Sequence, residues 1–276
     1  DQGRPFSEGL AAVRMKDRWG YIDMGGKTVI APRFADAWSF SQALAAVTED
    51  GVRWGYIDQS GRMHVPARFE WAEDFHDGLA AVKREGKWGF INLRGEFAIS
   101  PRFAAAGRFA EGLAAAKQGE KWGYVDRTGK WVIQPAFEYA DACEQERALI
   151  ANEGKYGFID SSGKAVVEPT FDIAFTFSEG LAAVCRDEKC GYINKNGEIV
   201  IPPQYEDVGP FSQGLAPVRV GGKWGYIDTA GKQVVEPQFG FAGVFAKVRV
   251  PEGAIPPGPA PEPANAQPDT KGPQTE

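Results

Sequence analysis

Histidine, cysteine and long hydrophobic runs are scarce in this sequence of 276 residues, and each scarcity argues against a class of protein. Two histidines and three cysteines leave little material for histidine acid–base catalysis or for a zinc site, which normally takes four Cys or His ligands. No run of about 18 apolar residues occurs, so we expect no membrane insertion. No stretch of useful length has helical periodicity, which argues against a helical bundle.

Basic residues are not in excess either. The 31 Lys and Arg are outnumbered by 37 Asp and Glu, for a formal net charge of −6. Nucleic-acid affinity depends largely on clustered Lys and Arg, so we expect no nucleic-acid partner. The sequence also lacks a glycine-rich phosphate loop, a His-x-x-x-His pair and a Gly-x-Ser-x-Gly nucleophile elbow. We therefore expect neither an enzyme nor a bound cofactor or metal.

What the sequence does contain is an internal repeat. The dipeptide Trp-Gly recurs, and after one step of 35 residues every later step is 34 residues. Its first position is occupied by Trp19, Trp54, Trp88, Trp122, Tyr156, Cys190 and Trp224. A fixed period of this length is the signature of a repeat architecture.

Each unit approximates FSEGLAAVxxxxKWGYIDxxGKxVIxPxF, as in residues 6–34, 109–137 and 211–239. This pattern resembles the WG, or KWG, repeat family of bacterial β-repeat proteins, and the resemblance covers residues 4 to about 250. It implies a β-repeat fold and no particular activity.

Two short β-type runs in each unit, LAAV and WGYID in the first, predict a hairpin. Turn residues such as Glu85-Gly86 lie between the two runs and need positive φ. Closing the hairpin of the first unit places Arg14 opposite Trp19, with a cation over the indole.

A second turn is predicted from the Asp-x-x-Gly-Lys pattern, which sets Asp23 opposite Lys27 in the first unit. The later pairs are Asp58/Arg62, Asn92/Glu96, Asp126/Lys130, Asp160/Lys164, Asn194/Glu198 and Asp228/Lys232. Wherever the second residue is acidic the first is Asn, which avoids like charges facing each other. Turn structure thus explains the Asp column better than metal binding or sugar hydrolysis. Each unit is predicted to be a three-stranded antiparallel meander whose third strand ends at a proline such as Pro32.

These features predict an all-β fold, in which seven stacked meanders form a tandem, open and curved array. A closed, propeller-like ring of seven units is the alternative. The units are expected near residues 6–39, 40–74, 75–108, 109–142, 143–176, 177–210 and 211–244, within an array spanning residues 1–250. A capping strand is expected at residues 245–250 and a disordered Pro-rich tail at residues 251–276.

Two cysteines are placed for a disulfide. Cys190 occupies the Trp position of the sixth unit and Cys185 the position opposite, within disulfide reach. We predict the Cys185–Cys190 bond, and the alternative is that both are small apolar fillers of a drifted repeat. Cys143 replaces a repeated Phe and is predicted to be a buried filler. A disulfide favours a periplasmic or extracellular location in a bacterium. The start at Asp1 rather than Met fits removal of a signal peptide and an arbitrary boundary of the sequence equally well.

Aromatic residues outside the repeat consensus are the predicted binding residues. Phe97 and Trp131 hold the same position in consecutive units, where other units have Thr28, Ala165 or Gln233. Four more aromatics lie in the variable linkers between units: Trp38, Trp71, Tyr139 and Phe175. They are candidates for anchors of a protein partner or platforms for sugar rings. The alternative is that they fill irregular gaps between units.

The predicted function is non-catalytic binding or scaffolding, with a protein partner outside the cytoplasm. A carbohydrate- or peptidoglycan-binding module of the cell envelope is one alternative. An immunity-type partner of a bacterial toxin is another.

Overall fold

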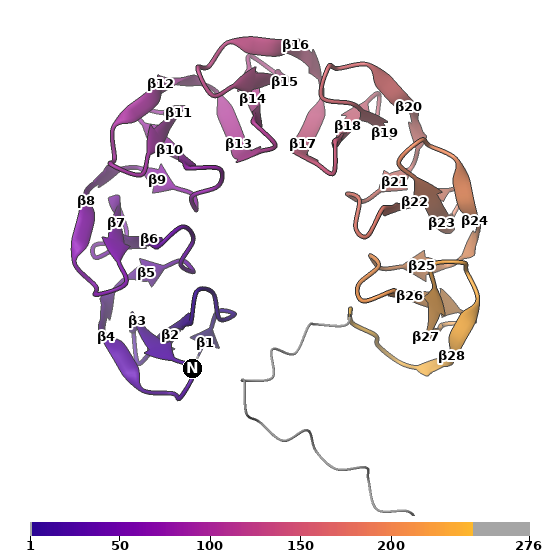
Figure 1. The fold of residues 1–276 in the computed structure, drawn as a ribbon, viewed down its shortest axis with the longest axis horizontal. Coiled ribbons are helices and arrows are strands. Elements are labelled where there is room, and N and C mark those ends of the chain that lie inside the picture. The colour runs from indigo at the N-terminus through magenta and orange to yellow at the C-terminus, as the bar shows by residue number, and fades with distance from the viewer. Residues whose placement is uncertain (1, 245–276) are drawn as a thin grey trace, which may run out of the picture. The chain divides into compact units, whose positions relative to one another are not determined.

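The computed structural model describes residues 2–244, which form seven consecutive antiparallel sheets of four strands each (Figure 1). Strands follow their sequence order within every sheet. Over this range there is no helix, and hence none that could cross a bilayer. The capping strand predicted at residues 245–250 and the tail predicted at residues 251–276 lie outside the described residues.

The strand bounds repeat from sheet to sheet. Sheet 1 contains β1 (Gln2–Gly3), β2 (Leu10–Met15), β3 (Arg18–Asp23) and β4 (Thr28–Phe34), and sheet 2 contains β5 (Asp36–Ala37), β6 (Leu44–Thr48), β7 (Trp54–Asp58) and β8 (Met63–Phe69). Sheet 3 contains β9 (Trp71–Ala72), β10 (Leu79–Arg84), β11 (Lys87–Asn92) and β12 (Phe97–Phe103), and sheet 4 contains β13 (Ala105–Ala110), β14 (Leu113–Gln118), β15 (Lys121–Asp126) and β16 (Trp131–Phe137). Sheet 5 contains β17 (Tyr139–Glu144), β18 (Arg147–Asn152), β19 (Lys155–Ile159) and β20 (Ala165–Phe171), and sheet 6 contains β21 (Ile173–Ala174), β22 (Leu181–Arg186), β23 (Lys189–Asn194) and β24 (Ile199–Tyr205). Sheet 7 contains β25 (Asp207–Val208), β26 (Leu215–Val220), β27 (Lys223–Asp228) and β28 (Gln233–Phe239).

Each sheet has one strand more than the predicted meander. The additional strand comes from the linker before the unit, and in sheet 2 it pairs Asp36 with Thr48 and Ala37 with Val47. In five of the sheets this strand is only two residues long, too short to show an alternating pattern in the sequence. Figure 1 shows the sheets side by side along an open arc, with this short strand innermost and the fourth strand outermost.

The predicted hairpin register is confirmed, because Arg14 pairs with Trp19 and Glu85 and Gly86 have φ values of 53° and 73°. The source of the cation is different from the prediction. In the described part of the chain the guanidinium over the Trp19 ring is that of Arg4, at 5.1 Å from the centroid. Arg4 precedes the hairpin and comes from the segment next to β1, so pairing across the hairpin does not reveal it.

The second turn is also confirmed. In sheet 1 the Asp23 carboxylate accepts the backbone N–H of Lys27 at 2.9 Å, and the backbone of Asp23 bonds to that of Lys27. In sheet 3, Asn replaces the Asp of this turn and forms a side-chain hydrogen bond, because Asn92 Nδ2 donates to Glu96 Oε2 at 3.0 Å. The Asp column therefore serves turn formation.

The prediction that the third strand ends at proline is wrong, since β4 continues through Pro32 to Phe34. The backbone of the outer strand bulges at this point: Trp19 pairs with Phe34 whereas Tyr21 pairs with Ile30. The bulge leaves Pro32 out of the ladder, as its missing N–H requires. It also brings the outer strand against Gly20, where an added Cβ would lie 2.5 Å from the Ile30 carbonyl oxygen. This close approach explains the glycine of the Trp-Gly dipeptide.

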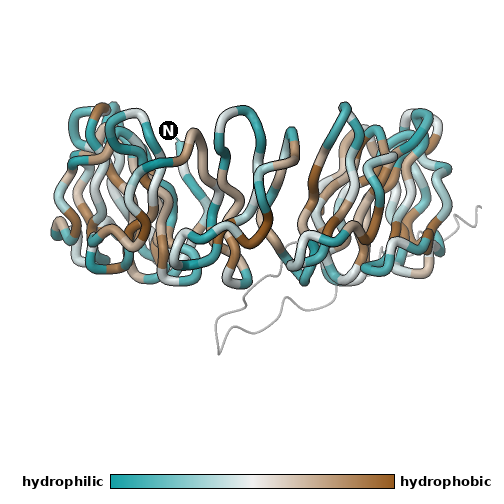
Figure 2. The backbone as a smooth tube through the Cα atoms, turned by 90° about the horizontal axis from the view of Figure 1, so that it is seen from above, coloured by the Kyte–Doolittle hydropathy of each residue, from teal (hydrophilic) through white to brown (hydrophobic). Residues whose placement is uncertain are grey.

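Consecutive sheets pack face to face through a repeated aromatic contact. The Tyr21 ring lies 4.9 Å from the Phe40 ring of the next sheet, and the Tyr21 hydroxyl donates to the Trp38 carbonyl at 2.8 Å. Six buried clusters fill the six interfaces between consecutive sheets. Residues 2–244 contain no such cluster between sheets 1 and 7, in agreement with the predicted open array. Figure 2 shows mostly hydrophilic loops at the two rims of this wall of sheets.

Carboxylates along one rim join neighbouring units. Glu8 accepts backbone N–H groups from Gln42 at 2.7 Å and from Ala43 at 2.9 Å, both in the turn that precedes β6. Gln42 itself has a positive φ of 55°, which turns its N–H toward the preceding unit. Charged acceptors of backbone N–H groups make strong hydrogen bonds, so this contact fixes the spacing of the sheets.

Candidate binding surfaces

The repeated Trp positions are structural. Trp19 and Trp54 are 8% and 4% exposed, respectively, and each pairs across its hairpin and with the outer strand. The corresponding residues of sheets 3, 4, 5 and 7 are partly buried: Trp88, Trp122, Tyr156 and Trp224. Because the position recurs in the repeat and pairs in the same way in each sheet, its role in the fold accounts for these rings.

Phe97 and Trp131, by contrast, each line a surface hollow along sheets 2 to 4. Two hollows of about 360 and 230 Å³ adjoin along sheets 2 and 3, and a third of about 580 Å³ lies along sheets 3 and 4; we refer to the three together as the rim groove. The first two hollows share Arg84 and Glu85, whereas the third shares no lining residue with them. The rim groove is lined by Arg53, Ala67, Arg68, Glu70, Arg84, Glu85, Lys87, Phe97, Pro101, Arg102, Phe103, Gln118, Gly129, Lys130, Trp131 and Gln134.

Each of the two aromatic rings is held by the sheet before its own. Phe97 lies edge-on to Phe69 at 6.1 Å between centroids, and Trp131 lies edge-on to Phe103 at 5.6 Å. Both rings are half-buried, so one side packs in the interface and the other lines the groove. The ring contacts within residues 2–244 do not join Phe97 to Trp131. The two rings are therefore separate from each other, each packed against the preceding sheet, and one repeat apart in the sequence.

The rim groove is cationic. Six Lys and Arg side chains line it against two carboxylates, Glu70 and Glu85. Glu70 accepts the backbone N–H of Gly86 at 3.1 Å, and Glu85 lies 3.4 Å from the Arg84 guanidinium. Both carboxylates are therefore already engaged. Arg68 and Arg102 donate to the carbonyls of Gly95 and Gly129, which leaves their positive charge uncompensated by a carboxylate.

Trp38 and Trp71 belong to a different place, on the inner side of sheets 1 to 3. Their rings pack with Trp54, with centroids 6.2 Å and 5.3 Å from it respectively, and Arg4 lies 4.1 Å from the Trp38 ring. Trp71 is 37% exposed and donates its indole N–H to Glu73 at 2.7 Å. These two residues mainly fill the interface between units.

Tyr139 and Phe175 are both 42% exposed and lie in sheets 5 and 6. Tyr139 lies on the inner strand β17 and packs edge-on against Tyr156. Phe175 lines a separate hollow of about 440 Å³ beside the disulfide. The six predicted residues thus lie in at least four separate places rather than on one continuous face.

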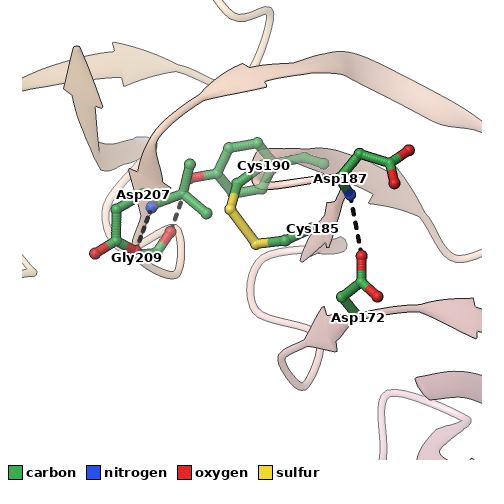
Figure 3. The surroundings of a disulfide bond; sticks show 8 residues. Asp172, Cys185, Asp187, Cys190, Asp207 and Gly209 are labelled. Atoms are coloured by element: carbon green, nitrogen blue, oxygen red, sulfur yellow. Dashed lines mark hydrogen bonds between the residues drawn. A yellow bond between two sulfur atoms is a disulfide. The ribbon is translucent and has the colours of Figure 1, made fainter. Parts of the chain in front are cut away.

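The predicted disulfide is present between Cys185 and Cys190, whose Cα atoms are 4.0 Å apart (Figure 3). Cys143 is buried, as predicted, and burial raises the pKa of its thiol to about 11. Across residues 2–244 no three His, Cys, Asp or Glu side chains are grouped so that they could hold a metal ion.

One group of titratable residues was not expected from the sequence. A hollow of about 310 Å³ between sheets 3 and 4 contains Asp74, His76 and Arg108. Burial, with Glu73 nearby, raises the pKa of Asp74 to about 6, and burial lowers the pKa of His76. These residues come from different sheets and from no shared motif, so the sequence contains no signal for them.

The polar lining of the rim groove was missed as well. Gln118, Lys130 and Gln134 lie beside Trp131 although each comes from a different repeat position. The only available signal was the variation of these positions between units, and surface positions vary for many reasons.

Seven consecutive four-stranded antiparallel sheets, packed face to face along an arc, define a β-repeat protein of the propeller type. The profile of the WG containing repeat family matches the sequence eight times in succession, over residues 1–19, 19–52, 54–88, 88–122, 122–156, 156–190, 191–224 and 224–247. The chain belongs to this family. No curated protein matches the sequence significantly.

Solved structures with a similar fold have different sequences. A eukaryotic initiation factor is 12% identical with a TM-score of 0.58, over 84% of this chain and 74% of that chain. BamB from Moraxella catarrhalis is 10% identical with a TM-score of 0.47, over 82% and 81% of the two chains. The WD40 β-propeller domain of Doa1 is 10% identical with a TM-score of 0.40, over 78% and 88%. At such identities the likeness concerns the fold alone.

Proposed function

We propose that this protein is a non-catalytic scaffold that binds an acidic segment of a protein partner in the rim groove. The observation that carries the proposal is the lining of the rim groove, in which the rings of Phe97 and Trp131 lie among six cationic side chains. The repeat does not require an aromatic ring at either position, because other sheets have Thr28 or Gln233 there. Aromatic and Arg side chains are the residues that contribute most to protein interfaces.

Charge complementarity selects the kind of partner. Complementary potentials speed association and exclude wrong partners, so a segment rich in Asp and Glu fits this groove. Its apolar side chains would contact Phe97, Pro101 and Trp131 while its carboxylates meet Arg68, Arg84 and Lys130.

A glycan is the second candidate, and one part of the groove favours it. In the third hollow the Trp131 ring lies with the amides of Gln118 and Gln134 and with Lys130. An aromatic platform surrounded by amide and cationic donors suits a sugar ring with acidic substituents.

The proposed location is outside the cytoplasm. The Cys185–Cys190 disulfide supports it, because disulfides persist in oxidising compartments and are rare where thiols are kept reduced.

The test is affinity capture from native envelope extract with wild-type protein and two variants. Phe97→Ala/Trp131→Ala removes the two aromatic rings, whereas Met63→Ala/Ile199→Ala changes the same repeat position in sheets 2 and 6, where both side chains are exposed. We expect one acidic protein to be captured by the wild type and the control but lost from the first variant. Equal capture by all three, with circular dichroism showing them folded, would contradict the proposal.

The two candidates separate in a parallel assay. If a protein segment is the ligand, the wild type should not bind acidic oligosaccharides on a microarray. Binding that depends on Trp131, with no captured protein, would establish the glycan instead.

A further inference from the structure

The disulfide lines a cleft between sheets 6 and 7 whose other lining residues are acidic or apolar. We call the hollow of about 440 Å³ between sheets 6 and 7 the disulfide cleft, and it is lined by Asp172, Ile173, Phe175, Cys185, Asp187, Glu188, Cys190, Glu206 and Asp207. Its apolar wall is open to solvent, since Ile173 is 49% and Phe175 42% exposed. Figure 3 shows the disulfide between Asp187 and Asp207.

The interface of sheets 2 and 3 shows what can fill this space. Phe175 and Asp207 occupy the repeat positions that Trp38 and Trp71 occupy there. The two indoles of that interface pack with Trp54, which is equivalent to Cys190. At the disulfide cleft only one of the three positions carries a ring, so the volume that the other two rings fill is left open.

The first interface shows which side chain fits such a space. Arg4 and Asp36 stand at the positions of Phe175 and Asp207, and Arg4 Nη2 lies 3.1 Å from Asp36 Oδ1. The same guanidinium lies over Trp19, the residue equivalent to Cys190. Asp36 and Asp207 also make the same kind of local hydrogen bond. Each carboxylate accepts the backbone N–H of the next residue, at 2.8 Å and 2.9 Å respectively. Asp207 therefore makes the same backbone contact as Asp36 but has Phe175 where Asp36 has Arg4. Its strand partner Arg219, which stands where Asp36 has Thr48, lies 3.8 Å from the Glu206 carboxylate.

The remaining carboxylates separate into engaged and free groups. Asp172 accepts Lys155 Nζ and the Asp187 backbone N–H, and these bonds hold its pKa below the usual range. Glu206 accepts two glycine N–H groups in the hairpin of sheet 7. Asp187 and Glu188 at the hairpin tip make no side-chain hydrogen bond or ion pair within residues 2–244. Negative charge at the mouth of the cleft is thus available to a partner.

We propose that the disulfide cleft binds an arginine side chain from a basic segment of a protein partner. The guanidinium pairs with Asp207 as Arg4 pairs with Asp36, and the aliphatic stem lies on Phe175 and Ile173. Asp187 and Glu188 attract the neighbouring basic residues of that segment. This surface is separate from the rim groove and has the opposite charge, so it serves a second contact.

The test uses fluorescein-labelled heptapeptides in which leucine alternates with arginine or, in the control peptide, with glutamine. Fluorescence anisotropy with the full chain gives the Kd of each peptide at low salt. Asp207→Asn removes the paired carboxylate, and Phe175→Arg supplies an internal arginine at the position of Arg4. Asp17→Asn removes an equal charge from the hairpin tip of sheet 1, where the Asp17 side chain is 97% exposed.

We expect the arginine peptide to bind the wild type at least tenfold more tightly than the glutamine peptide. Because a hydrogen bond between charged groups is stronger than one between neutral groups, Asp207→Asn should weaken binding by about tenfold or more, which corresponds to about 1.4 kcal/mol or more. Phe175→Arg should weaken it comparably, and Asp17→Asn should change it less than twofold. Equal binding of the two peptides, wild-type affinity in both cleft variants, or an equal loss in Asp17→Asn would each overturn the proposal.

Discussion

Replacing the glycine of one Trp-Gly dipeptide by alanine should destabilise the array strongly. At Gly89 an added Cβ would lie 2.6 Å from the Ile99 carbonyl oxygen and 2.7 Å from the Pro101 nitrogen, both in the backbone of the outer strand. Backbone cannot rotate away as a side chain can, so β12 must separate from β11. Overpacking of this kind costs about 3 kcal/mol, which corresponds to a fall of about 6–12 °C in the thermal midpoint.

The matched control is Gly107→Ala. Neither glycine has a positive φ, and an added Cβ at Gly107 meets only ordinary contacts, the nearest being the Ala115 Cβ at 3.7 Å. Differential scanning calorimetry of wild type and both variants should show a large fall for Gly89→Ala and less than about 2 °C for Gly107→Ala. Similar midpoints for the two variants would refute the assignment of the dipeptide glycine to the bulge.

Three further predictions concern stability. Tyr124→Phe removes the 2.7 Å hydrogen bond to the Asp141 carbonyl between sheets 4 and 5 and should lower the free energy of unfolding by about 1 kcal/mol in urea titrations. An unchanged free energy of unfolding would show that this hydrogen bond does not stabilise the interface. Burial raises the pKa of Asp74 from 3.8 to about 6, so the folded state loses stability as pH rises from about 4 to above 6. Asp74→Asn should therefore gain about 1–2 kcal/mol at pH 8 and nothing at about pH 3.5 in thermal melts, and an equal gain at both would contradict this. Cys185→Ser/Cys190→Ser should cost up to about 2 kcal/mol, and dithiothreitol should lower the midpoint of the wild type alone.

The repeat period predicted most of the fold because the strongest signals recur in every unit. The pairing of Arg14 with Trp19 followed from the hairpin turn, and the asparagine at position 92 was explained by the acidic Glu96 opposite it. The strand formed by Asp36–Ala37 was missed because two residues cannot display a pattern. The continuation of β4 beyond Pro32 was missed because a bulge, and not a strand end, accommodates the missing N–H.

The candidate sites were predictable only in part. Departure from the consensus pointed to Phe97 and Trp131, and substitution at the Trp position pointed to Cys185 and Cys190. The groove around the two rings depends on side chains of three sheets, and no sequence spacing reveals which of them meet. The open space beside Asp207 likewise emerges only when the interfaces are compared, which requires the stacking of the sheets.

Hydrogen–deuterium exchange of the captured complex tests the central proposal most directly. Backbone amides around residues 84–87, 97–103, 117–121 and 129–134 border the rim groove, and the equivalent segments of sheets 5 to 7 serve as internal references. We predict slower exchange of the groove segments on partner binding and unchanged exchange in the references. Protection confined to sheets 5 to 7, or to the turns that contain Glu8 and Gln42, would contradict binding in the rim groove.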